Sequence, residues 1–113
     1  MEQIKFSTNW NNKLDSLYYT TIRLGSFKYH IGRDYDIVLH NKHLHIAQIK
    51  HIAIKLLWEI TDTEFMLDTG YDKIESINMF MKMYPNVEWN KQRIFHITLK
   101  RIDIYNKSTQ PIQ

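Results

Sequence analysis

The strictest constraint on the fold is a run of alternating side chains near the end of the chain. Between Arg93 and Ile102 the sequence reads RIFHITLKRI, in which the apolar residues Phe95, Ile97 and Leu99 alternate with polar ones. Successive side chains of a β-strand point to opposite faces, so this period of two is typical of a half-buried strand. A chain with such a strand must also supply strands that pair with it.

Segments rich in branched and aromatic side chains supply those partners, because such side chains suit a pleated surface. In the longest segment the alternation of Leu44 and Ile46 continues only after a change of register, at Ile49 or Ile52. Gly32 and the pair Asn41-Lys42 predict turns. The expected strands are residues 3–6, 19–24, 36–39 and 43–54.

A first helix is predicted between the first two strands. Ser7 or Thr8 can cap it, since a hydroxyl accepts hydrogen bonds from the free amides of a first turn. Trp10, Leu14 and Leu17 then follow at spacings of four and three. This spacing predicts an amphipathic helix.

A second helix is predicted before the last strand. Thr61 and Glu64 have the spacing of a capping box, which predicts a short helix from Asp62 to about Leu67, ending near Gly70.

A third, longer helix follows, capped by Asp72 and ended by Pro85. Apolar residues at spacings of three and four mark its expected buried face. These residues are Ile74, Ile77, Phe80, Met81 and Tyr84.

These elements predict an α+β fold with a curled, mostly antiparallel sheet and two or three flanking helices. The chain has 113 residues, of which 43% are hydrophobic, so it can bury one core. We expect a single domain over residues 1–105 and a polar tail over residues 106–113.

Composition excludes several classes of function. The chain has no cysteine, so disulfide frameworks and thiolate chemistry are excluded. No apolar run is long enough for a membrane span and no signal peptide begins the sequence, so we expect a cytoplasmic protein without a membrane partner. The formal net charge of +3 is compatible with nucleic-acid binding without requiring it.

The stretch YYTTIR is the candidate site that the residues themselves suggest. Tyr19, Thr21 and Arg23 share one face of the predicted strand. A phenol, a hydroxyl and a guanidinium can stack on a base, bond its edge and hold a phosphate. The alternative is structural: Arg23 pairs with a carboxylate at the surface, and Thr21 merely favours a strand.

Four stretches together resemble the ASCH domains of the PUA-like superfamily. They are SLYYTTIR from Ser16 to Arg23, HIGRD around Gly32, the helix ending in MYP and the closing strand FHITLKRI. The resemblance covers roughly residues 4–102. It implies a PUA-like barrel with a ligand cleft beside the second strand.

One motif of this family can be compared position by position. ASCH domains carry G-x-K-x-x-E-x-R, and a bacterial branch that hydrolyses acetylated cytidine has threonine in the glutamate position. Arg23 matches the arginine, Thr21 matches that threonine, Ser16 replaces the glycine and Tyr18 replaces the lysine. That branch also uses a glutamate shortly before the long helix, where this chain has Asp68.

The first functional hypothesis is a binding module for RNA, a nucleotide or a modified base, without a cofactor. Tyr18, Tyr19 and Arg23 would contact the ligand beside the second strand. Trp89 lies in a polar loop, where it would either stack on a base at the rim of the cleft or cap the end of the barrel.

The second hypothesis is a small amidohydrolase that acts on an acetylated nucleoside. Thr21 would be the nucleophile, and Asp68 would assist it. The lysine expected to activate the threonine is replaced by Tyr18, whose phenol stays protonated at neutral pH. Lys28 could supply the missing amine if it reached Thr21.

A third hypothesis is a viral or bacterial accessory protein that binds another protein.

Three further groups of residues have a structural and a functional interpretation. The histidines could hold zinc, but their spacing matches no metal motif, so we expect no metal site. The aromatic residues Trp10, Trp58, Phe80, Tyr84 and Phe95 are expected in the core. The basic residues either gather on one surface that contacts phosphates or are solvated separately. The histidines are His40, His43, His45 and His51, and the basic residues are Lys42, Lys50, Lys55, Lys91, Arg93, Lys100 and Arg101.

Overall fold

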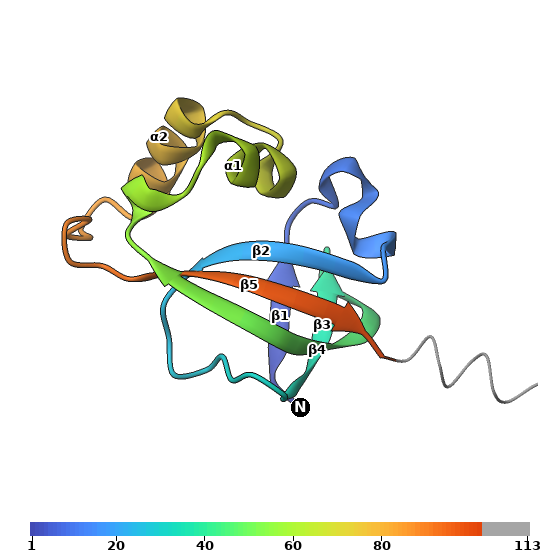
Figure 1. Ribbon diagram of the computed structural model, residues 1–113. Coiled ribbons are helices and arrows are strands. Elements are labelled where there is room, and N and C mark those ends of the chain that lie inside the picture. Colours follow the sequence, from blue (N-terminus) through green and yellow to red (C-terminus); the bar gives the residue numbers. More distant parts are fainter. Residues whose placement is uncertain (103–113) are drawn as a thin grey trace, which may run out of the picture.

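The alternating segments pair into one curled, five-stranded sheet (Figure 1). The structure is a computed structural model that describes residues 1–102, so the predicted tail lies outside the described residues. The strand order is β1-β3-β4-β5-β2. β1 pairs with β3 in parallel, and the other pairings are antiparallel, which confirms a curled and mostly antiparallel sheet. The strands are β1 (Gln3–Phe6), β2 (Tyr18–Leu24), β3 (Asp34–Leu39), β4 (Lys42–Lys55) and β5 (Ile94–Arg101).

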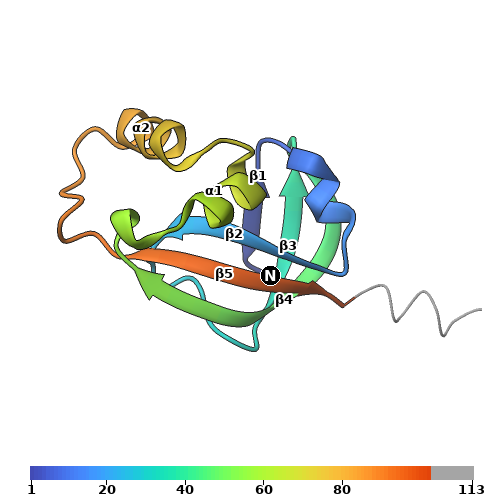
Figure 2. The ribbon, with the colours of Figure 1, turned by 45° about the horizontal axis from the view of Figure 1, so that its top comes forward.

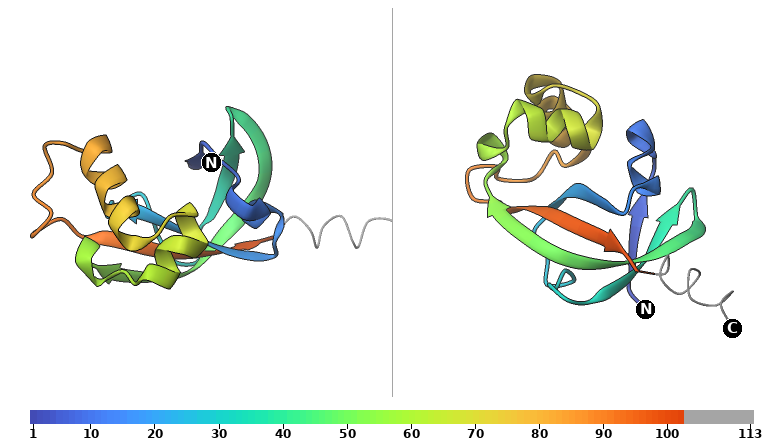
Figure 3. Two further views of the ribbon diagram at one scale, coloured as in Figure 1. Left: turned by 90° about the horizontal axis from the view of Figure 1, so that it is seen from above. Right: turned by 45° about the vertical axis from the view of Figure 1, so that its right-hand side comes forward.

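The long strand β4 belongs to both halves of the curl. Its first half pairs with β3 and its second half pairs with β5. The register shifts between Ile49 and His51, which confirms the predicted change. β1 and β3 consequently cross the direction of β2 and β5 (Figures 1 and 3). The sheet forms a half-barrel, and its two edge strands are β1 and β2.

Two α-helices follow β4, as the capping signals predict. They are α1 (Asp62–Thr69) and α2 (Lys73–Met83), and they lie together over one end of the sheet (Figure 2). The Thr61 hydroxyl accepts from the amide of Glu64, and Asp72 caps α2 in the same way. Gly70 ends α1 with a left-handed φ of 82°. Two short 3-10 helices, η1 (Trp10–Asp15) and η2 (Leu57–Glu59), complete the described elements.

The helix predicted between β1 and β2 is present only as the short 3-10 helix η1, and its predicted amphipathic face is wrong. Asn11 and Asn12 in η1 have left-handed φ values of 51° and 56°, which interrupt any regular helix. Leu14 is buried, whereas Trp10 and Leu17 are exposed. Asparagine tolerates this backbone region better than most residues, and the two turns let η1 cross the open side of the half-barrel.

The predicted positions of several apolar residues also need correction. On α2, Phe80 is buried as predicted and Ile77 packs against the same cluster, whereas Ile74 is 73% exposed. Trp10, Trp58 and Tyr84 are exposed rather than in the core, whereas Phe80 is buried and Phe95 packs against the core.

Two apolar clusters lie on opposite faces of β2. One fills the half-barrel and includes Tyr19, and the other lies between the sheet and the helices and includes Ile22. Both faces of β2 are therefore packed, so a site on this strand must lie at its free edge. None of the helices within residues 1–102 is long and apolar enough to cross a bilayer.

Candidate ligand site at the seam of the half-barrel

A pocket of about 510 Å³ opens where the free edges of β1 and β2 face the helices. We call the opening between these two strands the seam, and this cavity the seam pocket. Thr21 and Arg23 line it from β2, and Asp68 lines it from the C-terminal half of α1. Three residues that the sequence placed in a site are therefore brought together. Tyr18, Tyr19 and Trp89 do not line this pocket.

An ion pair between Lys13 and Asp68 completes the free edge of β2. Lys13 Nζ lies 2.8 Å from Asp68 Oδ1 and also donates to the main-chain oxygens of Thr20 and Asp68. The other carboxylate oxygen, Oδ2, accepts from the amide of Ile22. The pair thus occupies main-chain groups of β2 that no strand covers, which protects an edge strand from unwanted pairing.

Arg23 connects the two edges of the sheet. Its Nε donates to Thr21 Oγ1 over 3.0 Å, and its Nη2 donates to the main-chain oxygen of Lys5 in β1 over 2.7 Å. The guanidinium also lies over the ring of Phe6, 4.7 Å from the centroid. Arg23 thus contacts a hydroxyl, a carbonyl and an aromatic face, and not the carboxylate that the structural alternative expected. No carboxylate among residues 1–102 therefore forms an ion pair with this guanidinium at the pocket.

Aromatic side chains form another wall of the seam pocket. Trp10 from η1 and Tyr71 after α1 stack with ring centroids 6.4 Å apart and an angle of 24° between the planes. Both are partly exposed, and Tyr84 lines the pocket from the end of α2. A Cβ atom at Gly70 would overlap the indole of Trp10, so the glycine lets this ring approach.

The structure places two predicted ligand-binding tyrosines away from the seam pocket. Tyr19 is 5% exposed, and its hydroxyl hydrogen-bonds to Nε2 of the buried His45 over 2.6 Å, so it belongs to the interior of the half-barrel. Tyr18 lies on the opposite face of β2, where Lys100 Nζ is 5.6 Å from its ring centroid. Strand alternation carries Tyr18 away from Thr21.

Trp89 supports the seam pocket from behind. Its ring packs edge-on against Phe80 and Tyr84, and it adds to the cluster between the sheet and the helices. This packing fits the predicted role of Trp89 as a cap on the end of the fold better than it fits stacking on a base at the rim of a cleft.

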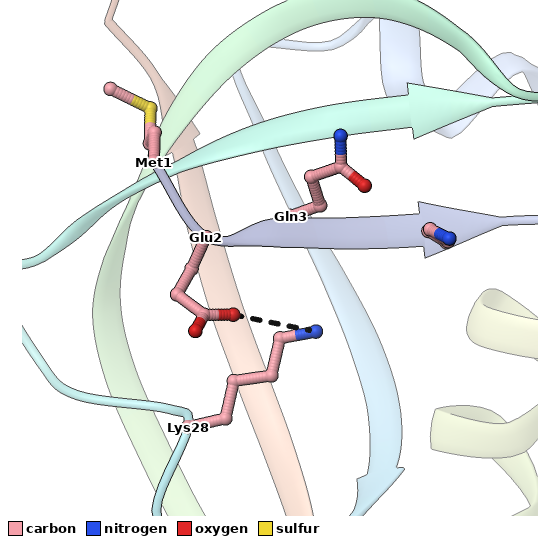
Figure 4. A pocket seen from close by; sticks show the side chains of 5 residues that line it. Met1, Glu2, Gln3 and Lys28 are labelled. Atoms are coloured by element: carbon pink, nitrogen blue, oxygen red, sulfur yellow. Dashed lines mark ion pairs between the residues drawn. The ribbon is translucent and has the colours of Figure 1, made fainter.

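Lys28 does not reach Thr21. It lies in the loop between β2 and β3, and its ammonium is 4.0 Å from a carboxylate oxygen of Glu2, toward which it points (Figure 4). Both residues line a separate pocket of about 570 Å³ at the start of β1. An ammonium group in the seam pocket comes instead from Lys13, which donates to the main-chain oxygen of Thr20 and carried no signal in the sequence.

The histidines do not converge. A register shift in the β3–β4 pair separates His43, which contacts Asp36 at the surface, from His45, which is buried against Tyr19. Within residues 1–102 no group of three histidine, aspartate or glutamate side chains could hold a metal ion.

The basic residues lie apart in ion pairs or at separate sites. Lys55 pairs with Glu64 and Lys91 pairs with Glu88. β4 pairs with β5, which places Lys100 opposite Gln48, and Gln48 accepts a hydrogen bond from Lys50. That surface is on the face of Tyr18 and not at the seam pocket.

Glu64 anchors α1 to the sheet and so fixes the position of Asp68. The hydrogen bond from the amide of Thr61 lowers the pKa of Glu64 from 4.5 to about 2, helped by Lys55 and opposed by desolvation. Lys55 extends from β4, and His96 Nδ1 from β5 lies 3.2 Å from the same carboxylate. Because a lowered pKa means that folding favours the charged form, this carboxylate stabilises the attachment.

No protein-family model, no curated protein and no solved structure matches this chain. The seam pocket thus combines the cations Arg23 and Lys5, the ion pair of Lys13 and Asp68, a buried hydroxyl and a stacked aromatic wall.

Proposed function

We propose that the seam pocket binds a nucleotide or a modified nucleoside, as a PUA-like binding module would. The observation that carries this proposal is the convergence of Thr21, Arg23 and Asp68 on one cavity that also has an aromatic wall. The rings of Trp10 and Tyr71 offer flat faces for a base. The guanidinium suits a phosphate or the acceptor edge of a base, since charge-assisted hydrogen bonds are the strong ones.

The bonding of Lys13 favours binding over catalysis. Its three protons point to three acceptors, namely one carboxylate oxygen and two main-chain oxygens. A group held in this way is an ammonium ion, whereas a general base needs a free electron pair. Lys13 therefore organises the pocket and balances Asp68 in the state described.

Titration with nucleosides, nucleoside monophosphates and their N-acetylated forms tests this proposal. Isothermal calorimetry would give Kd, and indole resonances would report contact with Trp10. The conservative variant Thr21→Val removes the hydroxyl but keeps the branched shape, and Tyr71→Leu removes the stacking ring. We expect weaker binding in both variants. A parent protein that binds none of these ligands at millimolar concentration would overturn the proposal.

The second candidate is hydrolysis of an acylated nucleoside, which the presence of Lys13 beside Thr20 and Asp68 favours. Lys13 would first have to give up one hydrogen bond and its extra proton. Thr21 Oγ1 would then attack the acyl carbon and pass its proton to Nζ, and the released amine would take that proton. Water would finally cleave the acyl-threonine ester. Mass spectrometry of the protein during turnover would detect this ester, and Thr21→Ala would abolish it.

A further inference from the structure

A second cavity adjoins the seam pocket on the other side of β1. It measures about 420 Å³ and lies beside β3 and the β3–β4 turn. Lys5, Phe6 and Ser7 line both cavities, which therefore meet along the end of β1. We call the second cavity the hairpin pocket and the two together the seam groove.

The hairpin pocket has the charge and shape to hold an anionic ligand. Lys5 and His40 line it, and no carboxylate of the described residues does. Lys5 is exposed, and no acidic side chain within residues 1–102 pairs with its ammonium. The buried residues Val38 and Phe6 give the pocket an apolar floor. Lys5 thus stands free at the junction of two cavities.

The β3–β4 turn has a backbone that is fixed at two points. His40 and Asn41 have left-handed φ values of 52° and 64°, as in the two-residue turns that suit the twist of a hairpin. The amide of His40 donates to the oxygen of Phe6 over 3.4 Å and so ties the turn to the end of β1. An imidazole and an amide are therefore presented next to Lys5 without a large cost of ordering on binding.

We propose that the seam groove binds single-stranded nucleic acid across two adjoining nucleotides. This inference rests on the proposed function, because the first base would occupy the seam pocket. Lys5 would contact the phosphate that links the two nucleotides, and the second would lie against Ser7, His40 and Asn41. A cation between two cavities matches the repeat of base, phosphate and base, whereas a mononucleotide would leave the hairpin pocket empty.

Length dependence separates this inference from the proposed function. We would measure Kd by calorimetry for nucleoside monophosphates, dinucleotides and tetranucleotides of RNA and DNA, at about 50 and 200 mM salt. We expect dinucleotides to bind about tenfold or more tightly than monophosphates, as a charge-assisted contact allows. Each phosphate contact on a single strand should add about 0.7 to the slope of log K against log salt.

Variants of the hairpin pocket should reduce the gain with length. Lys5→Gln should remove that gain and lower the salt slope by about 0.7. His40→Asn should weaken dinucleotide binding and still fold, since asparagine tolerates a left-handed backbone. Lys91→Gln, a change at an exposed lysine outside the groove, is the matched control.

Two results would overturn the inference while the proposed function stands. One is equal affinity for monophosphates and dinucleotides, and the other is a length gain that survives in both groove variants. Tighter binding of a duplex than of its single strands would also overturn it. If neither nucleosides nor strands bind, the proposed function fails as well.

Discussion

Arg23 Nη2 donates a hydrogen bond of 2.7 Å to the main-chain oxygen of Lys5, and this bond joins the two edge strands of the sheet. β1 and β2 are not paired with each other, so a side chain stands here where a strand ladder would close a full barrel. The same guanidinium faces the seam pocket. Closure of the seam and the proposed binding of an anion therefore depend on one residue.

Arg23→Ala is expected to weaken nucleotide binding about tenfold or more, because it removes a charge-assisted contact worth roughly 1.5–3 kcal/mol. Calorimetric titration measures the loss. The variant should also loosen the seam, which a thermal melt would show. Arg33→Ala removes an equal charge from an exposed position and is the control for net charge. Equal Kd values for the parent and Arg23→Ala would refute the assignment.

Gly70→Ala should destabilise the protein more than Gly32→Ala. Both glycines have left-handed backbones, with φ of 82° and 86°, so both variants carry a conformational cost of roughly 1–2 kcal/mol. At Gly70 the new methyl group would also overlap the indole of Trp10, whereas nothing lies within 4 Å at Gly32.

Chemical denaturation measures that difference, for which we expect roughly 1–3 kcal/mol from overpacking. The indole resonance of Trp10 should shift in Gly70→Ala and stay in place in Gly32→Ala. Equal stability of the two variants would show that Trp10 moves aside freely.

Glu64→Gln should remove a component of stability that depends on pH. The folded pKa of Glu64 is about 2, below the unfolded value of 4.5, so its stabilising effect is full above pH 4.5 and is lost as the pH falls to about 2. Since the carboxylate is partly exposed, we expect a loss on the order of 1 kcal/mol at pH 7.

Glutamine can still accept from the amide of Thr61, so Glu64→Gln isolates the effect of charge, and Glu64→Ala also removes the cap. Urea denaturation of the parent and both variants between pH 2 and pH 7 provides the comparison. If the parent and Glu64→Gln differ by the same amount at every pH, the carboxylate does not titrate as described.

Hydrolysis of N-acetylated cytidine should be slow or absent in the parent, because Lys13 is held as an ammonium by three acceptors. The lost general-base contribution corresponds to roughly 10² to 10⁴ in rate. Tyr18→Lys should give no gain, since position 18 faces away from Thr21. Chromatographic assays of both proteins test this expectation.

Rapid turnover that Thr21→Ala and Lys13→Met both abolish would identify the second candidate function as correct. Turnover that survives both changes would place the chemistry elsewhere in the molecule.

The strands and caps of this fold are predictable because their signals are local. The alternation around Ile97 and the Thr61–Glu64 capping box each depend on neighbours within a few residues, and both are found in the structure. The prediction of a regular helix at Trp10 was wrong because the spacing of apolar residues does not reveal the left-handed backbones of Asn11 and Asn12.

The site was only partly predictable because it is assembled over long sequence distances. Alternation correctly put Thr21 and Arg23 on one face of β2, but both faces of this strand are packed, so alternation could not tell which tyrosine is buried. The role of Lys13 depends on its ion pair with Asp68, which lies 55 positions away in the sequence and is brought close only by folding.

The place of β5 has a consequence for synthesis of the chain. β5 lies between β2 and β4 in the sheet, and it pairs residues 18–24 with residues 94–100. While the chain is being made, β2 has no strand to join until this last element has emerged. The first ninety residues would therefore hold an unpaired strand during translation, so a chaperone that covers β2 would assist this protein most while it is still on the ribosome.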